Sequence, residues 1–434
     1  MKKIAITGLL IRILGMGIGL VSSVLLARLL GPVIFGQYAF LITVTELLSI
    51  AALFGTPALI LREVAAGIEK EDFKRVRGII AWSRKETLFI SVPVVAVGAG
   101  IIYSWQRSHG YNMEVLTWII PLILVVINAL SRQGTNVLQG LNRLIASQAL
   151  SIIFAPAVFA AILIAAYLVP DLRMGLEITL LLLLGCRLLA FVAIYWTQQY
   201  SLPADVRRAA PEIHGQEWLR SALPLLLVGS LLIINTRIDI IMLGYLRDAG
   251  DVGLYRVAQR GAQFMLFGVM AVDSIINPLA AKAWANGAKE ELQAAVSKSI
   301  WLVLLFSLPL LIVFIVAGKP AINLSFGQAY EKAWFPLIIL SCGYLSLALL
   351  GRGGVILTMS HCERQTALAI GIGVTANIAL NLLLIPLYGI KGAAVATALA
   401  VSLRMLMETI FAYKKTGINT TIFALLPKWV AFKP

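Results

Sequence analysis

The chain has 434 residues, of which 60% are hydrophobic and 13% are charged, and its mean hydropathy is +0.90. A soluble fold cannot hide so much apolar surface from water, so this composition excludes one and predicts an integral membrane protein. The formal net charge of +15 would suggest nucleic acid in a soluble protein. In a membrane protein it favours anionic lipid or an anionic substrate, and we expect no nucleic-acid partner.

Apolar runs long enough to cross a bilayer recur about twelve times along the chain. A membrane helix needs about 20 mostly apolar residues. The first run follows Met1, Lys2 and Lys3 as in a signal peptide, but it continues to about Leu30 and therefore predicts an uncleaved span. The expected spans are residues 4–30, 35–60, 86–106, 115–138, 145–169, 175–197, 221–245, 253–279, 299–318, 333–358, 366–386 and 390–413.

The two halves of the chain repeat one pattern. LLARLLGP at 25–32 precedes FGQY at 35–38, and IIMLGY at 240–245 precedes VGLY at 252–255. Each copy ends one apolar run, makes a Gly-marked turn and begins a second run. Half-chain repeats built from hydrophobic hairpins are typical of membrane transporters.

A polar linker divides the repeat. Residues 201–218 are rich in charge and proline and separate six predicted spans from six. Both halves then enter the membrane in the same direction, which makes the repeat parallel. We predict an all-α protein with an N-terminal six-helix bundle (1–200), a cytoplasmic linker (201–218), a C-terminal six-helix bundle (219–413) and a cytoplasmic tail (414–434), with a central cavity between the bundles.

Lysine and arginine are distributed unevenly between the two sides of the membrane. With the N-terminus inside, the cytoplasmic segments carry 21 basic residues and the outer segments carry 7. Because basic residues are enriched on the cytoplasmic side, this asymmetry places both termini in the cytoplasm.

Eight basic residues remain, all of them arginines within predicted spans. An arginine at the centre of a membrane helix costs roughly 3 kcal/mol, so eight of them should not face lipid. They are Arg12, Arg132, Arg187, Arg237, Arg256, Arg260, Arg352 and Arg404.

Helical spacing indicates where several of these arginines point. Polar or small residues form continuous stripes with Arg12 (8, 12, 15, 19, 23), with Arg132 (128, 132, 135, 139) and with Arg256 and Arg260 (256, 260, 263). Such stripes suit the walls of a hydrated, cationic cavity that binds phosphate or diphosphate through parallel hydrogen bonds. We predict that Arg12, Arg132, Arg237, Arg256, Arg260 and Arg352 form this substrate-binding surface.

Two arginines fit other roles better. Arg187 has no polar stripe, which favours a side chain that snorkels to a headgroup. Arg404 precedes Glu408 by one helical turn, which favours a local ion pair.

Three acidic residues, Glu46, Asp239 and Asp273, also fall within predicted spans. They are candidates for ion coupling, and the alternative is an ion pair with an arginine of another span. Asp239 lies two residues from Arg237, so these two do not share a helix face.

The sequence contains no pattern typical of an enzyme or a cofactor site. No phosphate-binding Gly-x-x-x-x-Gly-Lys-Ser/Thr loop occurs, and three cysteines and three histidines form no metal motif, so we expect no cofactor and no metal. No Ser-His-Asp cluster is evident. The longest outer loop, about residues 319–332, is short, which counts against a polytopic glycan polymerase or ligase.

LLARLLGP with FGQY, followed by LILREVA at 59–65, resembles the polysaccharide-transport family of flippases, whose best-known members are the O-antigen flippases of the Wzx type. DIIMLG at 239–244, VGLY, and PLYGIKGAA at 386–394 are similar to that family as well. The resemblance covers nearly the whole chain. It places the chain in the multidrug/oligosaccharidyl-lipid/polysaccharide exporter superfamily, with two six-helix bundles around a V-shaped cavity.

The resemblance implies a function and partners. It implies that the protein flips an undecaprenyl-diphosphate-linked oligosaccharide, an O-antigen or exopolysaccharide repeat unit, across the bacterial inner membrane by alternating access. It also implies membrane lipids, a glycan polymerase and chain-length proteins as partners. The first span resembles that of lipid II flippases, whose arginines face the cavity, which adds Arg28 to the predicted site.

Lipid II flippases and multidrug exporters are the two related families in the same superfamily. Lipid II flippases usually have fourteen spans, and multidrug exporters are expected to use acidic cavities, so both fit less well. The alternatives to the flippase are an exporter of another anionic or amphipathic solute and, from a different class, a polytopic glycan polymerase or ligase.

Overall fold

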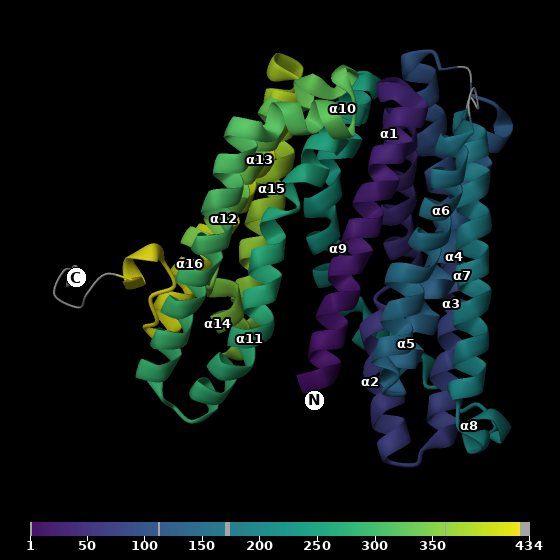
Figure 1. Cartoon of the computed structure of the whole chain (residues 1–434). Helices are drawn as coiled ribbons and strands as arrows, with labels where there is room; N and C mark the ends of the chain where they lie inside the picture. The colour runs from purple at the N-terminus through teal and green to yellow at the C-terminus, as the bar shows by residue number, and fades with distance from the viewer. Residues whose placement is uncertain (1, 112, 170–173, 361, 426–434) are drawn as a thin grey trace. The chain divides into compact units, whose positions relative to one another are not determined.

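The computed structural model describes residues 2–111, 113–169, 174–360 and 362–425, which are almost entirely helical and contain no strand. The predicted tail 414–434 is thus described only in part. The chain forms two compact units, residues 1–237 and 238–434 (Figure 1).

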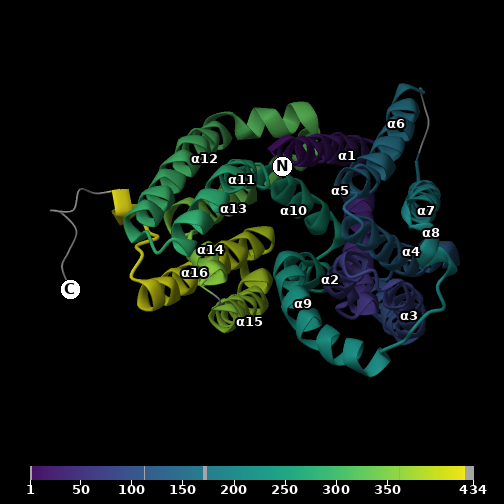
Figure 2. The same cartoon turned by 90° about the horizontal axis from the view of Figure 1, so that it is seen from below.

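Unit 1 is built around a central helix. It contains α1 (Lys2–Leu53), α2 (Thr56–Glu69), α3 (Phe73–His109), α4 (Val115–Gly140), α5 (Leu144–Gln148), the π-helix η1 (Ala149–Phe154), α6 (Ala155–Leu168), α7 (Leu176–Ser201), α8 (Ala204–Arg208) and the first part of α9 (Gly215–Leu246). Helix α4 packs against α1, α2, α3 and α7 (Figure 2). It therefore presents side chains to most of the unit.

Unit 2 has its own packing centre. It contains the end of α9, α10 (Ala249–Ala262), α11 (Met265–Ala285), α12 (Lys289–Ser325), η2 (Gln328–Ala333), α13 (Trp334–Leu349), α14 (Gly353–Met359), α15 (Glu363–Tyr388), α16 (Ile390–Thr416) and η3 (Ile422–Leu425). Helix α16 packs against α13, α14 and α15.

Helix α1 is two spans joined at Gly31. Its 52 residues would measure about 78 Å if straight, far more than the bilayer core of about 30 Å. Gly31 has φ 71° and ψ 171° and precedes Pro32, a combination that breaks the helix. The start of α1 and α2 lie at the same end of unit 1 (Figure 1), so the chain reverses here, as predicted for spans 4–30 and 35–60.

The all-helical membrane fold is confirmed. Ten segments of the described residues are long and apolar enough to cross a membrane. One of them, residues 7–53, carries two predicted spans, and the predicted span 221–245 lies on the 32-residue helix α9. Each of the twelve predicted spans therefore falls on helix.

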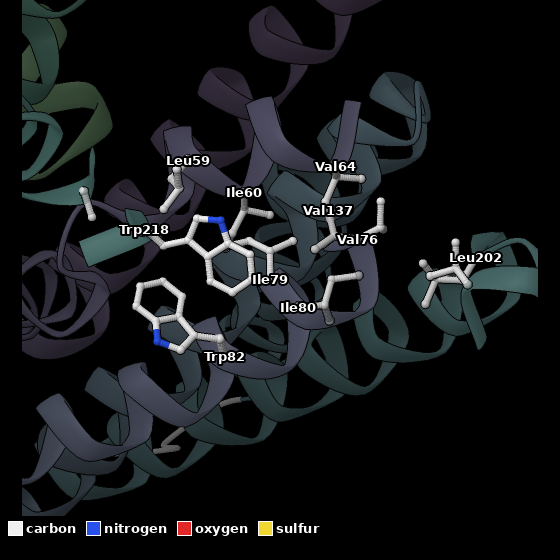
Figure 3. Packing of buried hydrophobic residues seen from close by; sticks show 12 residues of the cluster. Leu59, Ile60, Val64, Val76, Ile79, Ile80, Trp82, Val137, Leu202 and Trp218 are labelled. Carbon is white, nitrogen blue, oxygen red and sulfur yellow. The ribbon is translucent and has the colours of Figure 1, made fainter. Parts of the chain in front are cut away.

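The boundary between the two units lies inside α9, because the first part of α9 packs into unit 1. Trp218 is fully buried beside Trp82, with ring centroids 5.4 Å apart, within an apolar cluster from α2, α3, α4 and α9 (Figure 3). A Cβ on Gly78 would lie 1.8 Å from the Glu212 carbonyl oxygen, so glycine lets the linker approach α3. The predicted division into six and six spans at 201–218 stays a prediction.

Ion pairs reinforce this packing at the same end of unit 1. Arg75 of α3 bonds the carboxylates of Glu63 at 2.8 Å and Glu217 at 2.6 Å, and its guanidinium lies 6.0 Å from the Trp218 ring. His214 lies 4.0 Å from Glu217. One arginine thus ties α2 and the start of α9 to α3.

The Arg75–Glu217 bond predicts a pH-dependent stability. Arg75, by its hydrogen bond, lowers the pKa of Glu217 below the ordinary 4.5. Its stabilising contribution is therefore complete above that ordinary value and is lost as the pH falls through the folded-state pKa. We expect Glu217→Gln to lower the apparent Tm slightly at pH 7, with the difference from wild type shrinking as the pH falls below 4.5. Asp205→Asn, an exposed change in α8, is the control, and a pH-independent difference would contradict the prediction.

Candidate functional site

A polar cavity of about 410 Å³ lies inside unit 1. Its walls come from α1, α4, η1, α6 and α7, all within candidate membrane spans. Charged, amide and hydroxyl side chains dominate the lining, which consists of Glu46, Ser49, Asn128, Ser131, Arg132, Thr135, Asn136, Leu150, Ser151, Ile152, Ala155, Arg187, Ala190 and Ile194. A water-accessible chamber with this lining suits a charged or hydroxyl-rich ligand.

Two arginines of the lining have open hydrogen-bonding capacity. Arg132 on α4 is exposed to the cavity, and Arg187 on α7 is half-buried. Among the described residues, neither guanidinium has an ion pair or hydrogen bond, and the charges nearest Arg132 are those of Glu46, Arg187 and Arg237. Unpaired guanidinium groups in a membrane-embedded chamber are a ready site for an anion.

A third arginine reaches the cavity wall through an ion pair. Arg237, on α9, lies 2.9 Å from the carboxylate of Glu46 on α1, and the two side chains are 23% and 30% exposed. With Arg132 and Arg187, this pair gives the chamber a net charge of +2. We define these four side chains as the cavity charge cluster.

The π-helix η1 forms one wall. Leu150, Ser151 and Ile152 lie in this wider helical turn, and π-helices often occur at functional sites. A Cβ on Gly15 would lie 2.2 Å from Ile152 Cγ2, so α1 packs tightly against η1. In the polar stripe of the first span, Gly15 therefore serves helix packing. Arg12 of the same stripe is exposed on unit 1.

Three of the other predicted arginines donate hydrogen bonds to neutral side chains. Arg28 donates to the Tyr167 hydroxyl at 2.9 Å. On α10, Arg256 and Arg260 donate one turn onward to Gln259 and Gln263, at 3.0 and 3.2 Å. The predicted local pair of Arg404 with Glu408 has a separation of 3.9 Å.

Arg352 is held in the interior of unit 2. It is 4% exposed, pairs with Asp273 of α11, and lies at the break between α13 and α14. Its Nε and Nη2 have no hydrogen-bond partner among the described residues. Asp273 therefore has the ion pair that the sequence offered as the alternative to ion coupling, as Glu46 also has.

Asp239 is held by hydroxyl groups. It is 1% exposed, and its Oδ2 accepts hydrogen bonds from Tyr255 at 2.5 Å and from Thr397 at 3.4 Å. These residues come from α9, α10 and α16 of unit 2. A coupling role for Asp239 stays a prediction.

The structure therefore brings together part of the predicted site. Arg132, Arg237 and Glu46 meet in unit 1, and a common surface that also includes Arg12, Arg28, Arg256, Arg260 and Arg352 stays a prediction. Sequence reasoning missed Arg187, because its own helix shows no polar stripe. Its polar neighbours in the cavity come from α1, α4 and η1, which helical spacing within one span cannot reveal.

Two family models match the chain. The model described as "Polysaccharide biosynthesis protein" matches residues 1–284, and that of "Lipid II flippase MurJ" matches residues 146–432. Each covers more than half of the chain. The second match shows kinship with the lipid II flippases, which the predicted span count had disfavoured.

Curated relatives match over shorter regions. An uncharacterized membrane protein of Methanocaldococcus jannaschii is 29% identical over 202 residues, 44% of this chain and 40% of the relative. The "Probable low-salt glycan biosynthesis flippase Agl15" of Haloferax volcanii is 27% identical over 170 residues, 39% of this chain and 36% of the relative. The matches thus span less than half the length of these relatives.

Solved transporter structures share the fold along nearly the whole chain. An inward-facing multidrug resistance MATE transporter of the MOP superfamily has a TM-score of 0.75 at 14% identity, covering 95% of this chain and 98% of its own. A MOP superfamily transporter from Pyrococcus furiosus, described as having a binding pocket of reverse polarity, has a TM-score of 0.64 at 14% identity, covering 95% of both chains. At such identities the likeness shows the fold alone.

Taken with the two-unit helical fold, the family matches identify the chain as a multi-pass membrane protein that belongs to the polysaccharide-transport flippases of the MOP superfamily, the group that includes the polysaccharide biosynthesis proteins and the lipid II flippases.

Proposed function

We propose that the protein flips an undecaprenyl-diphosphate-linked oligosaccharide from the cytoplasmic to the outer leaflet by alternating access. The observation that carries this proposal is the cavity charge cluster, with its net charge of +2 inside a membrane-embedded chamber. A diphosphate esterified at both ends carries two negative charges, which this cluster would neutralise. Guanidinium groups bind phosphate oxygens in parallel pairs and stay charged at any physiological pH.

The rest of the lining fits the glycan. Asn128, Asn136, Ser131 and Ser151 supply amide and hydroxyl groups that can exchange hydrogen bonds with sugar hydroxyls. The name of the Haloferax volcanii relative, a glycan biosynthesis flippase, supports the same substrate class. We further propose a bacterial inner-membrane location with cytoplasmic termini, and a glycan polymerase and chain-length proteins as functional partners.

No nucleotide is required by this proposal. An inside-negative membrane potential favours outward movement of the diphosphate by roughly 2.3 kcal/mol per charge per 100 mV. The cluster would compensate the charge of the headgroup during transfer, so a proton carried by Asp239 or Asp273 is not needed. Consumption of the flipped lipid on the outer side would supply the remaining drive.

Reconstituted flipping tests the proposal. Purified protein in liposomes is given the same fluorescent oligosaccharide on undecaprenyl diphosphate, on undecaprenyl monophosphate or on a neutral polyprenyl glycoside. We expect the diphosphate form to flip at least about tenfold faster than the monophosphate, because it makes one more charge-assisted contact. Equal rates for the neutral glycoside would contradict the proposal, and a lengthened or transferred glycan in the products would favour the polymerase or ligase.

A further inference from the structure

The cavity charge cluster contains its own anion. Glu46 lines the chamber and lies 2.9 Å from Arg237, which does not itself belong to the lining. A ligand that enters the chamber therefore meets Arg132 and Arg187 directly, whereas Arg237 is already paired with the carboxylate of Glu46. Oε2, which faces Arg237, is buried, but the Glu46 side chain as a whole is 30% exposed, so an entering anion can compete with the carboxylate for Arg237.

The Glu46–Arg237 pair should separate more easily than Arg352–Asp273, another ion pair within the predicted spans. Arg352, which pairs with Asp273, is 5% exposed at its side chain, and separating that pair would leave a buried charge without a partner. Glu46 lines the chamber and the Arg237 side chain is 23% exposed, so both charges stay partly solvated, which lowers the cost of separating them. The carboxylate of Glu46 adjoins an open cavity.

We infer that Glu46 is an internal counter-ion that yields Arg237 to the diphosphate when substrate binds and recovers Arg237 when substrate leaves. This inference rests on the proposed function. In the empty protein, Glu46 neutralises Arg237 and keeps the cluster at +2. In the loaded protein, Arg237 becomes the third arginine on the headgroup.

Competition of this kind limits affinity and speeds release. A carrier must bind its cargo well enough to load and weakly enough to unload. Each charge-assisted contact that Arg237 makes to substrate replaces its ion pair with Glu46, so the net gain on binding is small. Loss of the carboxylate should thus tighten binding and slow turnover, opposite to the loss of binding expected when a ligand-contacting group is removed.

The chain also links this exchange to its two units. Arg237 is the last residue of unit 1, and two residues later Asp239 is anchored in unit 2 by Tyr255 and Thr397. Helix α9 is thus fixed on one side of the boundary by Glu46 and on the other by hydroxyl groups. Transfer of Arg237 from Glu46 to the ligand frees the attachment nearest the boundary, while Trp218 still holds the start of α9 in unit 1.

Binding of a headgroup mimic tests the inference. Full-length protein in nanodiscs is titrated calorimetrically with P1,P2-dimethyl diphosphate, and the substrate's flipping kinetics are measured in liposomes. We expect Glu46→Gln to lower the Kd by about tenfold, as one charge-assisted bond is gained without a competitor. The maximal flipping rate should fall, together with the substrate concentration at half-maximal rate.

Matched variants make the result decisive. Glu331→Gln removes an equivalent ion pair, with Lys319 at 2.8 Å outside the chamber, and should leave both measurements unchanged. In Glu46→Gln/Arg237→Gln, the gain in affinity should disappear, because the freed arginine is its source. Glu46→Ala repeats the test should the glutamine variant fold poorly.

Two results would overturn the inference: a Kd that Glu46→Gln leaves unchanged or raises, or a gain in affinity that survives without Arg237. Either leaves the proposed function standing if the wild type still binds the mimic and flips substrate. A wild type that neither binds a diphosphate nor flips its lipid-linked form overturns both.

Discussion

Replacement of Arg132 by glutamate is expected to reduce flipping at least about 100-fold, which corresponds to about 2.7 kcal/mol of activation free energy. The substitution takes the cavity charge cluster from +2 to zero. It removes charge-assisted hydrogen bonds worth about 1.5–3 kcal/mol and adds a carboxylate that repels the diphosphate. Initial rates in proteoliposomes, at equal protein content, give the measurement.

Two variants accompany this experiment. Arg132→Lys keeps the charge but loses the planar pair of donors, so we expect an intermediate rate. Arg107→Glu makes the same charge reversal at an exposed position of α3, outside the chamber, and should flip like wild type. A glutamate at 132 that flips within about threefold of wild type would show that the cluster does not bind the headgroup.

Replacement of Arg352 by alanine should damage unit 2 itself. Asp273, 31% exposed, would lose its ion-pair partner, and removal of the 5% exposed Arg352 would leave a void, so the cost should lie near the lower end of the about 3–5 kcal/mol for breaking a buried pair. A loss of this size is a large share of the 5–15 kcal/mol that stabilises a typical protein. We therefore expect a large drop in membrane abundance and in the apparent Tm in detergent.

The double variant distinguishes a structural role from substrate binding. Arg352→Met/Asp273→Asn removes both charges and should recover much of the abundance that Arg352→Ala loses. Normal abundance of Arg352→Ala with flipping abolished would instead place Arg352 among the substrate-binding arginines, as the sequence suggested.

The fold could be predicted in outline because its signals are local. Apolar runs of the right length identify helices, and Gly31 followed by Pro32 marks the reversal inside α1. The boundary within α9 could not be read in this way. It depends on Trp218 packing against Trp82 of α3, and no property of residues 201–218 taken alone indicates that contact.

The candidate site, like the fold, could be predicted only where its signals lie within one helix. The polar stripe around Arg132 and the acidic Glu46 within a predicted span are visible in the sequence, and both residues line the chamber. The inclusion of Arg187 and the partner of Arg237 depend on which helices meet. So does the π-helix η1, which packs against α1 at Gly15.

The position of the unit boundary has a consequence for biosynthesis. Domains emerge and fold from the N-terminus at about 5–20 residues per second. Six predicted spans are complete at residue 197, yet Trp218 and Ala222 belong to the apolar cluster at the N-terminal end of α3. A nascent chain halted in the 201–218 linker would leave this cluster open beside Trp82. Unit 1 should therefore mature only after the seventh span begins to enter the bilayer, so insertion of the second half completes the first.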